Sequence, residues 1–201
     1  LCGFKDRTSS FVFYSCHSLR TIKLQIALEE IGMCAFEECY SLQSITLPPN
    51  VKRIEAHTFK YCSSLQQVNH YHFIESIGTS AFYNCSRLHG FQISKKTTEL
   101  GDWAFAFCHS YEEAEIPSMV MKLPDGLFEG CTLLSKVTLP DHIKTIPANC
   151  FKDCKSLKDI NLPESLEVIG AGAFRNCYSY NQVVLPQMLR EIHPSAFRFC
   201  N

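Results

Sequence analysis

The sequence predicts a β-rich α/β repeat solenoid, because two residue ladders and a short alternating pattern recur at a constant interval. Nine cysteines follow one another 23 residues apart, and a phenylalanine stands three positions before each of them. The cysteines are Cys16, Cys39, Cys62, Cys85, Cys108, Cys131, Cys154, Cys177 and Cys200, and the phenylalanines are Phe13, Phe36, Phe59, Phe82, Phe105, Phe128, Phe151, Phe174 and Phe197. A unit of this length cannot bury its own apolar face, so it must stack on its neighbours. We therefore expect residues 1–201 to form one right-handed solenoid domain of about eight and a half units.

Each unit contains a segment typical of a half-buried strand, followed by a tight corner. Residues 44–47 alternate polar and apolar side chains, and proline, which cannot donate to a strand ladder, follows this segment in five units. A second short extended segment is expected before the isoleucine of a recurring Ile-Gly pair. Gly32, Gly78, Gly101 and Gly170 then allow a turn, and the Ala-Phe-x-x-Cys segment suits a short helical or 3₁₀ corner.

The repeat resembles the BspA-like, or treponemal-type, leucine-rich repeat, C-x-x-L-x-x-I-x-L-P-x-x-L-x-x-I-G-x-x-A-F-x-x-C. Residues 31–54 and 77–88 carry this motif most completely. The resemblance implies a leucine-rich-repeat solenoid with a parallel sheet on its concave side. It also implies a non-catalytic protein–protein interaction module, the adhesive array of a microbial cell-surface or secreted protein whose partner is a host extracellular protein. Two alternatives stay open, an intracellular scaffold in the cytoplasm and a passive spacer.

The composition agrees with a folded, non-catalytic domain. The chain is 46% hydrophobic and 19% charged with a net charge of −1, so it can bury a core and lacks the basic surface that binding to nucleic acid requires. No apolar run is long enough to predict membrane insertion of this segment. The sequence has no Gly-rich phosphate loop, no G-x-S-x-G and no H-E-x-x-H, so we expect no catalytic residues and no cofactor. Residues 1–12 fit the repeat poorly, and both ends lack the polar caps of a solenoid.

The cysteines are interpreted as buried thiols rather than disulfides or metal ligands. Stacked repeats place them one above another with parallel Cβ vectors, which leaves the Cβ atoms too far apart for a disulfide. Cys2, Cys34 and Cys150 lie outside the ladder and form no zinc-type C-x-x-C pair. His70 and His72 would share one face of a strand, so a metal pair is conceivable. Half-buried structural histidines are the preferred interpretation, and no metal is expected.

The exposed sheet face is the candidate binding surface. Residues five and seven positions after each cysteine should point outward, and most are polar. The proposed partner-binding residues are Gln67, Asn69, His89, Gln92, Glu112, Glu113, Glu115 and Lys136. Their acidic cluster could attract a basic patch on a partner, and the alternative is a merely solvated face. The third to fifth units depart most from the consensus, which indicates either a functional site or drift in a tolerant array. Tyr61, Tyr83 and Phe107 near the corners are further candidate anchors.

Overall fold

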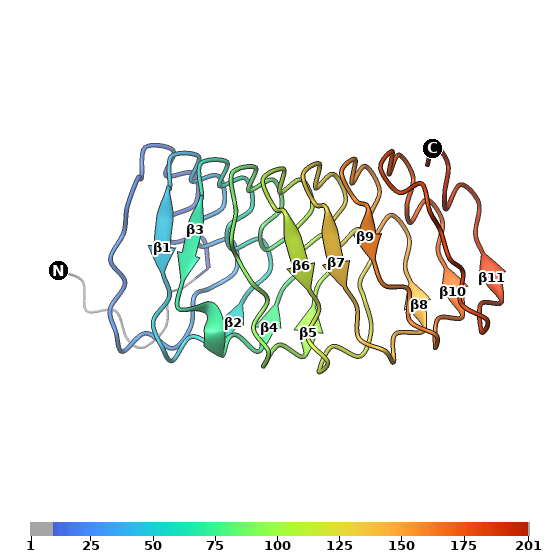
Figure 1. Cartoon of the computed structure of the whole chain (residues 1–201). Coiled ribbons are helices and arrows are strands. Elements are labelled where there is room, and N and C mark those ends of the chain that lie inside the picture. The colour runs from blue at the N-terminus through green and yellow to red at the C-terminus, as the bar shows by residue number, and fades with distance from the viewer. Residues whose placement is uncertain (1–9, 201) are drawn as a thin grey trace.

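The computed structural model describes residues 10–200, which form a rod of stacked coils with short parallel strands on one face (Figure 1). These strands are β1 (Ser44–Thr46), β3 (Gln67–Asn69), β6 (Glu113–Glu115), β7 (Lys136–Thr138) and β9 (Asp159–Ile160). Each pairs with a strand 23 residues away, as in Ser44↔Gln67 and Lys136↔Asp159. In β3, β6 and β7 the central residue is buried and its two neighbours are exposed, which confirms the predicted half-buried strand.

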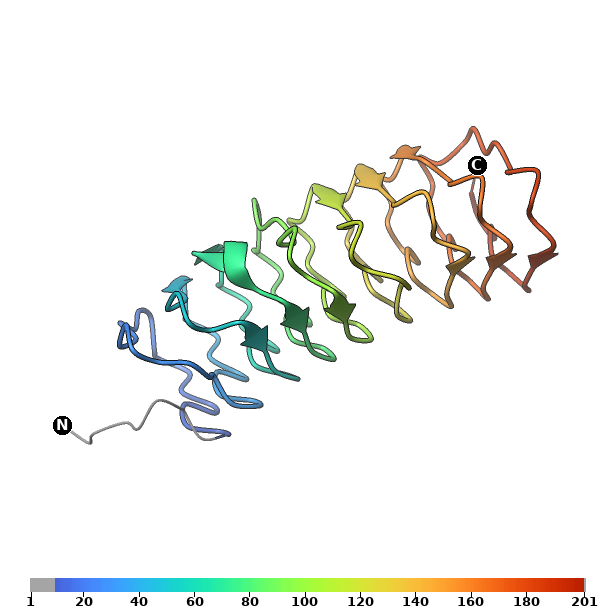
Figure 2. The same cartoon turned by 90° about the horizontal axis from the view of Figure 1, so that it is seen from below.

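A second set of strands follows the other side of the coils, as the sequence predicted for the segment before Ile-Gly. These strands are β2 (Arg53–Ile54), β4 (Ser76–Ile77), β5 (Glu99–Leu100), β8 (Thr145–Ile146), β10 (Val168–Ile169) and β11 (Glu191–Ile192). They form two parallel ladders, β2–β4–β5 and β8–β10–β11. Figure 2 shows the two sets of strands on opposite sides of the rod. We refer to the β1, β3, β6, β7 and β9 side as the sheet face.

The phenylalanine ladder forms the axis of the core. Neighbouring rings stack nearly parallel, with centroids between 5.1 Å for Phe13–Phe36 and 6.0 Å for Phe128–Phe151. The seven phenylalanines from Phe36 to Phe174 are completely buried. Each ring therefore depends on both neighbouring coils for its burial, which is the reason why one coil cannot fold alone.

The cysteine ladder lies beside the phenylalanine ladder and joins successive coils. Each ladder thiol from Cys39 to Cys200 donates to the carbonyl oxygen of the phenylalanine 26 residues earlier, at 3.0–3.1 Å. All described cysteines are free, and the seven from Cys39 to Cys177 in the ladder are fully buried. The prediction of buried thiols acting as weak donors is thus confirmed for these seven, whereas Cys16 and Cys200 are half-buried. Cys34 and Cys150 are also buried, and Cys2 lies outside the described residues.

The corners differ from the prediction in two respects. First, Ala-Phe-x-x-Cys forms consecutive hydrogen-bonded turns instead of a helix or 3₁₀ segment, because two residues per corner are left-handed; in one corner these are Cys34 (φ 55°) and Glu38 (φ 62°). Second, the turn expected at the Ile-Gly glycines forms, but these glycines are also required for close packing between coils. A Cβ on Gly101 would lie 2.3 Å from the backbone nitrogen of Thr79, and Gly101 is not among the glycines with positive φ.

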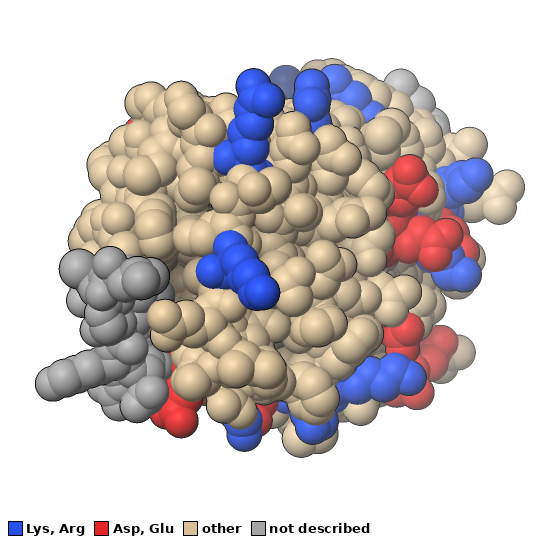
Figure 3. Space-filling view, turned by 90° about the vertical axis from the view of Figure 1, so that its left-hand side faces the viewer, with Lys and Arg blue, Asp and Glu red and all other residues tan. Residues whose placement is uncertain are grey.

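The end of the rod nearest the N-terminus is poor in charge. Figure 3 shows a surface in which acidic and basic side chains lie mostly toward the rim. Among the described residues Phe11 and Ile26 are exposed here, and Val184 and Phe199 are exposed near the other end. The predicted atypical start at residues 1–12 lies mostly outside the described part of the chain. Within residues 10–200 no helix is long and apolar enough to cross a membrane.

Candidate protein-binding face

The sheet face is interrupted at the fourth coil. Residues Gly90–Ile93 lie between β3 and β6 but form no strand, and no backbone hydrogen bond joins them to either strand in the described structure. Gly90 has a φ of +64°, so the chain cannot enter the coil in extended form. Figure 1 shows this coil passing between β3 and β6 without an arrow.

Exchanges of large and small side chains accompany the interruption. Phe91 occupies the position of a strand isoleucine or valine, and its ring packs on Phe82 at 5.1 Å and on Tyr71 at 4.8 Å. In the next coil the equivalent residue is the much smaller Ala114, which is also buried. The volume added in one coil is thus partly offset by volume removed in the next, so the core stays closed while the sheet opens.

A ridge stands beside the interruption. The 3₁₀ helix η1 (Tyr71–Phe73) replaces the proline that ends other strands, and it begins after His70, whose φ is 64°. The prediction that His70 and His72 are half-buried is therefore wrong, because β3 ends at Asn69 and both side chains are exposed. Because the strand has already ended, the two histidines do not share a strand face. Among the described residues no group of three or more His, Cys, Asp or Glu side chains is placed to hold a metal ion.

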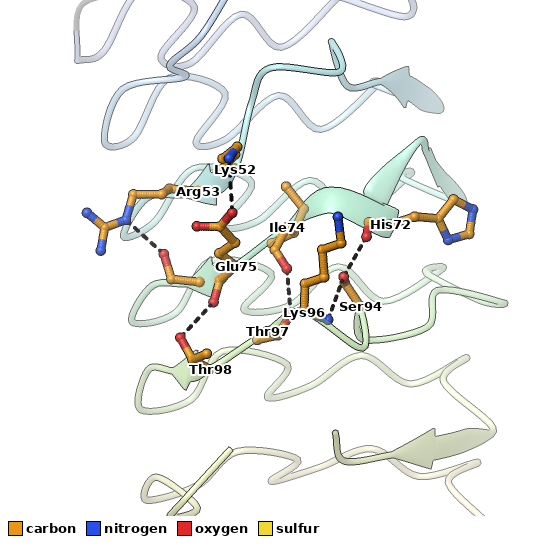
Figure 4. Close-up of polar contacts among 10 residues, drawn as sticks. Lys52, Arg53, His72, Ile74, Glu75, Ser94, Lys96, Thr97 and Thr98 are labelled. Atoms are coloured by element: carbon orange, nitrogen blue, oxygen red, sulfur yellow. Dashed lines mark hydrogen bonds and ion pairs between the residues drawn. The ribbon is translucent and has the colours of Figure 1, made fainter. Parts of the chain in front are cut away.

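The ridge is fastened to the fourth coil by side-chain hydrogen bonds (Figure 4). The Ser94 hydroxyl donates to the carbonyl oxygen of His72 at 2.8 Å, and the buried Thr97 hydroxyl donates to that of Ile74 at 2.9 Å. Thr97 replaces a consensus aliphatic residue, so its hydroxyl satisfies a carbonyl that lies within the core. The Lys96 ammonium group lies 4.8 Å from the centroid of the exposed Phe73 ring. These contacts fix the ridge relative to the coil that follows it.

A groove of about 490 Å³ lies between the ridge and β6. Of the predicted binding residues, it brings together Gln92, Glu113, Glu115 and Lys136. The other four predicted residues, Gln67, Asn69, His89 and Glu112, are exposed but do not line this groove. The groove is also lined by residues that the sequence did not mark as candidates, among them Tyr71, His72, Lys95, Lys96 and Thr138. The consecutive lysines, within the coil that departs from the consensus, were the available signal.

The groove carries opposite charges that are not paired with each other. Glu113 and Glu115 project from the same side of β6 and make no salt bridge within residues 10–200, nor does Lys95. Lys136 lies opposite Glu113 in the strand register, yet its ammonium group is 3.7 Å from Asp159. The groove therefore offers the exposed carboxylates of Glu113 and Glu115 on one wall and the exposed ammonium group of Lys95 on the other.

The thiols and corner aromatics provide no comparable site. Burial raises the pKa of Cys131 to about 12, so this thiol stays protonated and unreactive near neutral pH. Tyr61, Tyr83 and Phe107 are half-buried and pack edge to face, at 5.6 Å for Tyr61–Tyr83 and 5.2 Å for Tyr83–Phe107. Because these rings pack against one another, part of their surface is not available to a partner. The groove is therefore the better candidate for a binding site.

Comparison with known proteins agrees with this architecture. The family profile described as BspA type leucine rich repeat region matches residues 7–135 and 75–201, with six copies. No functionally curated protein matches the chain. A leucine-rich repeat protein from Bacteroides ovatus is 32% identical over 92% of this chain, with a TM-score of 0.88.

Two further solved structures share the fold. A leucine-rich repeat protein from Eubacterium ventriosum is 22% identical over 87% of this chain and 57% of its own, with a TM-score of 0.74. A leucine rich cell surface protein from Faecalibacterium prausnitzii is 22% identical over 96% of this chain and 67% of its own, with a TM-score of 0.54. The chain spans only 48% of the Bacteroides ovatus protein.

Proposed function

Because the chain belongs to the BspA-type leucine-rich repeat family, we propose that it is a non-catalytic protein-binding module, part of the adhesive array of a microbial cell-surface protein. The observation that carries this proposal is the groove between η1 and β6, where Lys95, Glu113 and Glu115 are exposed on a fixed support and make no salt bridge within residues 10–200. The surface location is supported by the name of the Faecalibacterium prausnitzii protein. The partner we propose is a host extracellular protein.

The mechanism is rigid display of side chains on a stacked core. The phenylalanine and cysteine ladders hold each coil against its neighbours, so the outward residues of the strands keep fixed positions. A partner that meets such a surface orders few groups on binding, and less conformational entropy is lost. Glu112, Glu113 and Glu115 would attract a basic patch on the partner and raise the association rate.

One observation favours a second candidate, an intracellular scaffold. All described cysteines are free thiols, as is usual for proteins in a reducing compartment. The stacked geometry explains free thiols equally well, because parallel neighbouring side chains cannot form disulfides. The compartment of the captured partner would therefore decide between the two.

The test is affinity capture with this chain as bait, run in parallel against host extracellular proteins and cytosol of the source cell. The variant Glu112→Lys/Glu113→Lys/Glu115→Lys should slow association with the captured protein about tenfold at low salt. A matched control, Glu75→Lys/Glu99→Lys/Glu191→Lys, changes the net charge equally through exposed residues in or next to the second set of strands.

Each outcome points to one interpretation. Capture of an extracellular protein, weakened by the first variant alone, supports the adhesive module. Capture only from cytosol supports the scaffold. Equal binding by the wild-type protein and both variants would show that the sheet face is not used, and capture from neither source would favour a passive spacer.

A further inference from the structure

Three hollows follow the ends of the sheet-face strands and join into one track. The first, about 710 Å³, lies over the first three coils, the second is the groove of about 490 Å³, and the third, about 570 Å³, lies beyond it. His72 lines the first and the second hollow, and Lys95 and Glu115 line the second and the third. In Figure 1, η1 lies just beyond the lower end of β3.

The chemistry of the track changes in a fixed order. Its first part is mainly apolar: it contains Pro48, Pro49 and the exposed side chains of Ile26 (78% exposed) and Phe73 (45%). Lys23, His70 and His72 lie at its edge, where their side chains are exposed. The fourth coil then contributes the ammonium groups of Lys95, which makes no salt bridge within residues 10–200, and of Lys96, which lies over the Phe73 ring.

The fifth coil contributes the carboxylates of Glu113 and Glu115. Along the rod the order is therefore apolar, positive and negative. A ligand that satisfies all three must carry an apolar group, an acid and a base in that order.

An extended peptide carries these three groups at the required spacing. Coils stacked as parallel strands are about 4.8 Å apart, and an extended chain advances about 3.3 Å per residue. The two coils from Pro48 to Lys95 correspond to about three residues, and the single coil from Lys95 to Glu115 to one or two. A nucleic acid would bring only negative charge to Glu113, and an ordinary glycan would bring no base.

We propose that the track binds an extended peptide segment of the partner with the spacing apolar–x–x–acidic–x–basic, read in either chain direction. This inference rests on the proposed function and specifies the partner of the same face. The apolar side chain occupies the hollow beside Phe73 and Pro48. The acidic side chain pairs with Lys95, and the basic side chain pairs with Glu113 and Glu115. Because hydrogen bonds from the fourth coil fix η1, the track is formed before the peptide arrives.

The test uses ten-residue fluorescent Gly/Ser peptides that contain one Phe, one Asp and one Lys. One peptide has the order Phe–x–x–Asp–x–Lys, a second has the Asp and Lys exchanged, and each is also made in reversed sequence. Anisotropy titrations with protein up to about 1 mM should show that the proposed order binds about tenfold more tightly in at least one direction. Replacing the peptide Phe with Ala should weaken binding at least about tenfold.

A charge-exchanged protein makes the test specific to the track. The variant Lys95→Glu/Glu113→Lys/Glu115→Lys should invert the preference between the two orders, with its fold checked by thermal melting. The control Arg53→Glu/Glu99→Lys exchanges an exposed pair on the second set of strands, 3.7 Å apart, and should leave the preference unchanged.

The inference is overturned if no peptide binds, if both orders bind equally, or if the exchanged protein keeps the original preference. If the affinity capture still depends on Glu112, Glu113 and Glu115 while the peptides show no preference, the protein-binding function stands and the peptide inference alone fails. If neither assay responds to the charge changes, both proposals fail.

Discussion

Lys136–Thr138 in β7 and the segment beginning at Gly90 occupy equivalent places in their 23-residue units, yet only the first is a strand. Beneath both, the phenylalanine and cysteine ladders continue without a break. Phe82 stacks on Phe105 at 5.3 Å under the interrupted coil, and Phe128 stacks on Phe151 at 6.0 Å near β7. The cysteine hydrogen bond is also 3.1 Å in both places, for Cys108 and for Cys154. The comparison teaches that stacking and surface display are separable: the ladders maintain the rod even where the sheet face opens.

The largest expected effect comes from breaking the shared core. Phe151→Ala and Phe82→Ala each remove a fully buried ring, and each should lower the free energy of unfolding by about 3–5 kcal/mol. Chemical denaturation would measure both, with Phe199→Ala as the control because that side chain is 50% exposed. If Phe82→Ala cost less than about 1 kcal/mol while Phe151→Ala cost the full amount, the core would not be continuous under the interrupted coil.

A smaller difference is expected between two glycines. A Cβ on Gly101 would meet the Thr79 backbone nitrogen at 2.3 Å, whereas a Cβ on Gly90 would have no heavy atom within 4 Å. Gly101→Ala should therefore destabilise the fold by about 2–3 kcal/mol, since one coil must move away from the next. Gly90→Ala should cost about 1 kcal/mol through its left-handed backbone alone. Thermal melting would compare the two, and equal losses would contradict the close approach at Gly101.

The regular coils could be predicted from the sequence, whereas the interruption of the sheet at the fourth coil could not. The constant spacing placed Phe128 and Cys131 in the core, and the alternation at 44–47 located β1. The third to fifth units departed from the consensus, but Phe91 still fitted the apolar position of a strand, so the sequence did not show that the fourth unit would lose its strand. That loss depends on how much space the neighbouring coils leave, which a single-residue pattern does not contain.

The same limit explains the other corrections. His70 occupies a position that is apolar in regular units, but its left-handed backbone turns the chain into η1 and leaves its side chain in solvent. The role of Gly101 depends on the backbone of the preceding coil, which passes beside it only after stacking. The groove is likewise assembled from coils three to six, so Tyr71 and Lys95 could not be identified as neighbours of Glu113.

The smallest effect in free energy distinguishes the two segments most directly. Because Gly90–Ile93 make no ladder hydrogen bond to β3 or β6, their amides should exchange with solvent at least about tenfold faster than those of β7. The double variant Gly90→Lys/Phe91→Val gives the fourth coil the residues found at Lys136 and Val137, and it should slow this exchange toward the rate of β7. Hydrogen–deuterium exchange by NMR would measure both segments in one sample. Equal protection in the wild-type protein would mean that the sheet is continuous, and the groove would then lose the interruption that creates it.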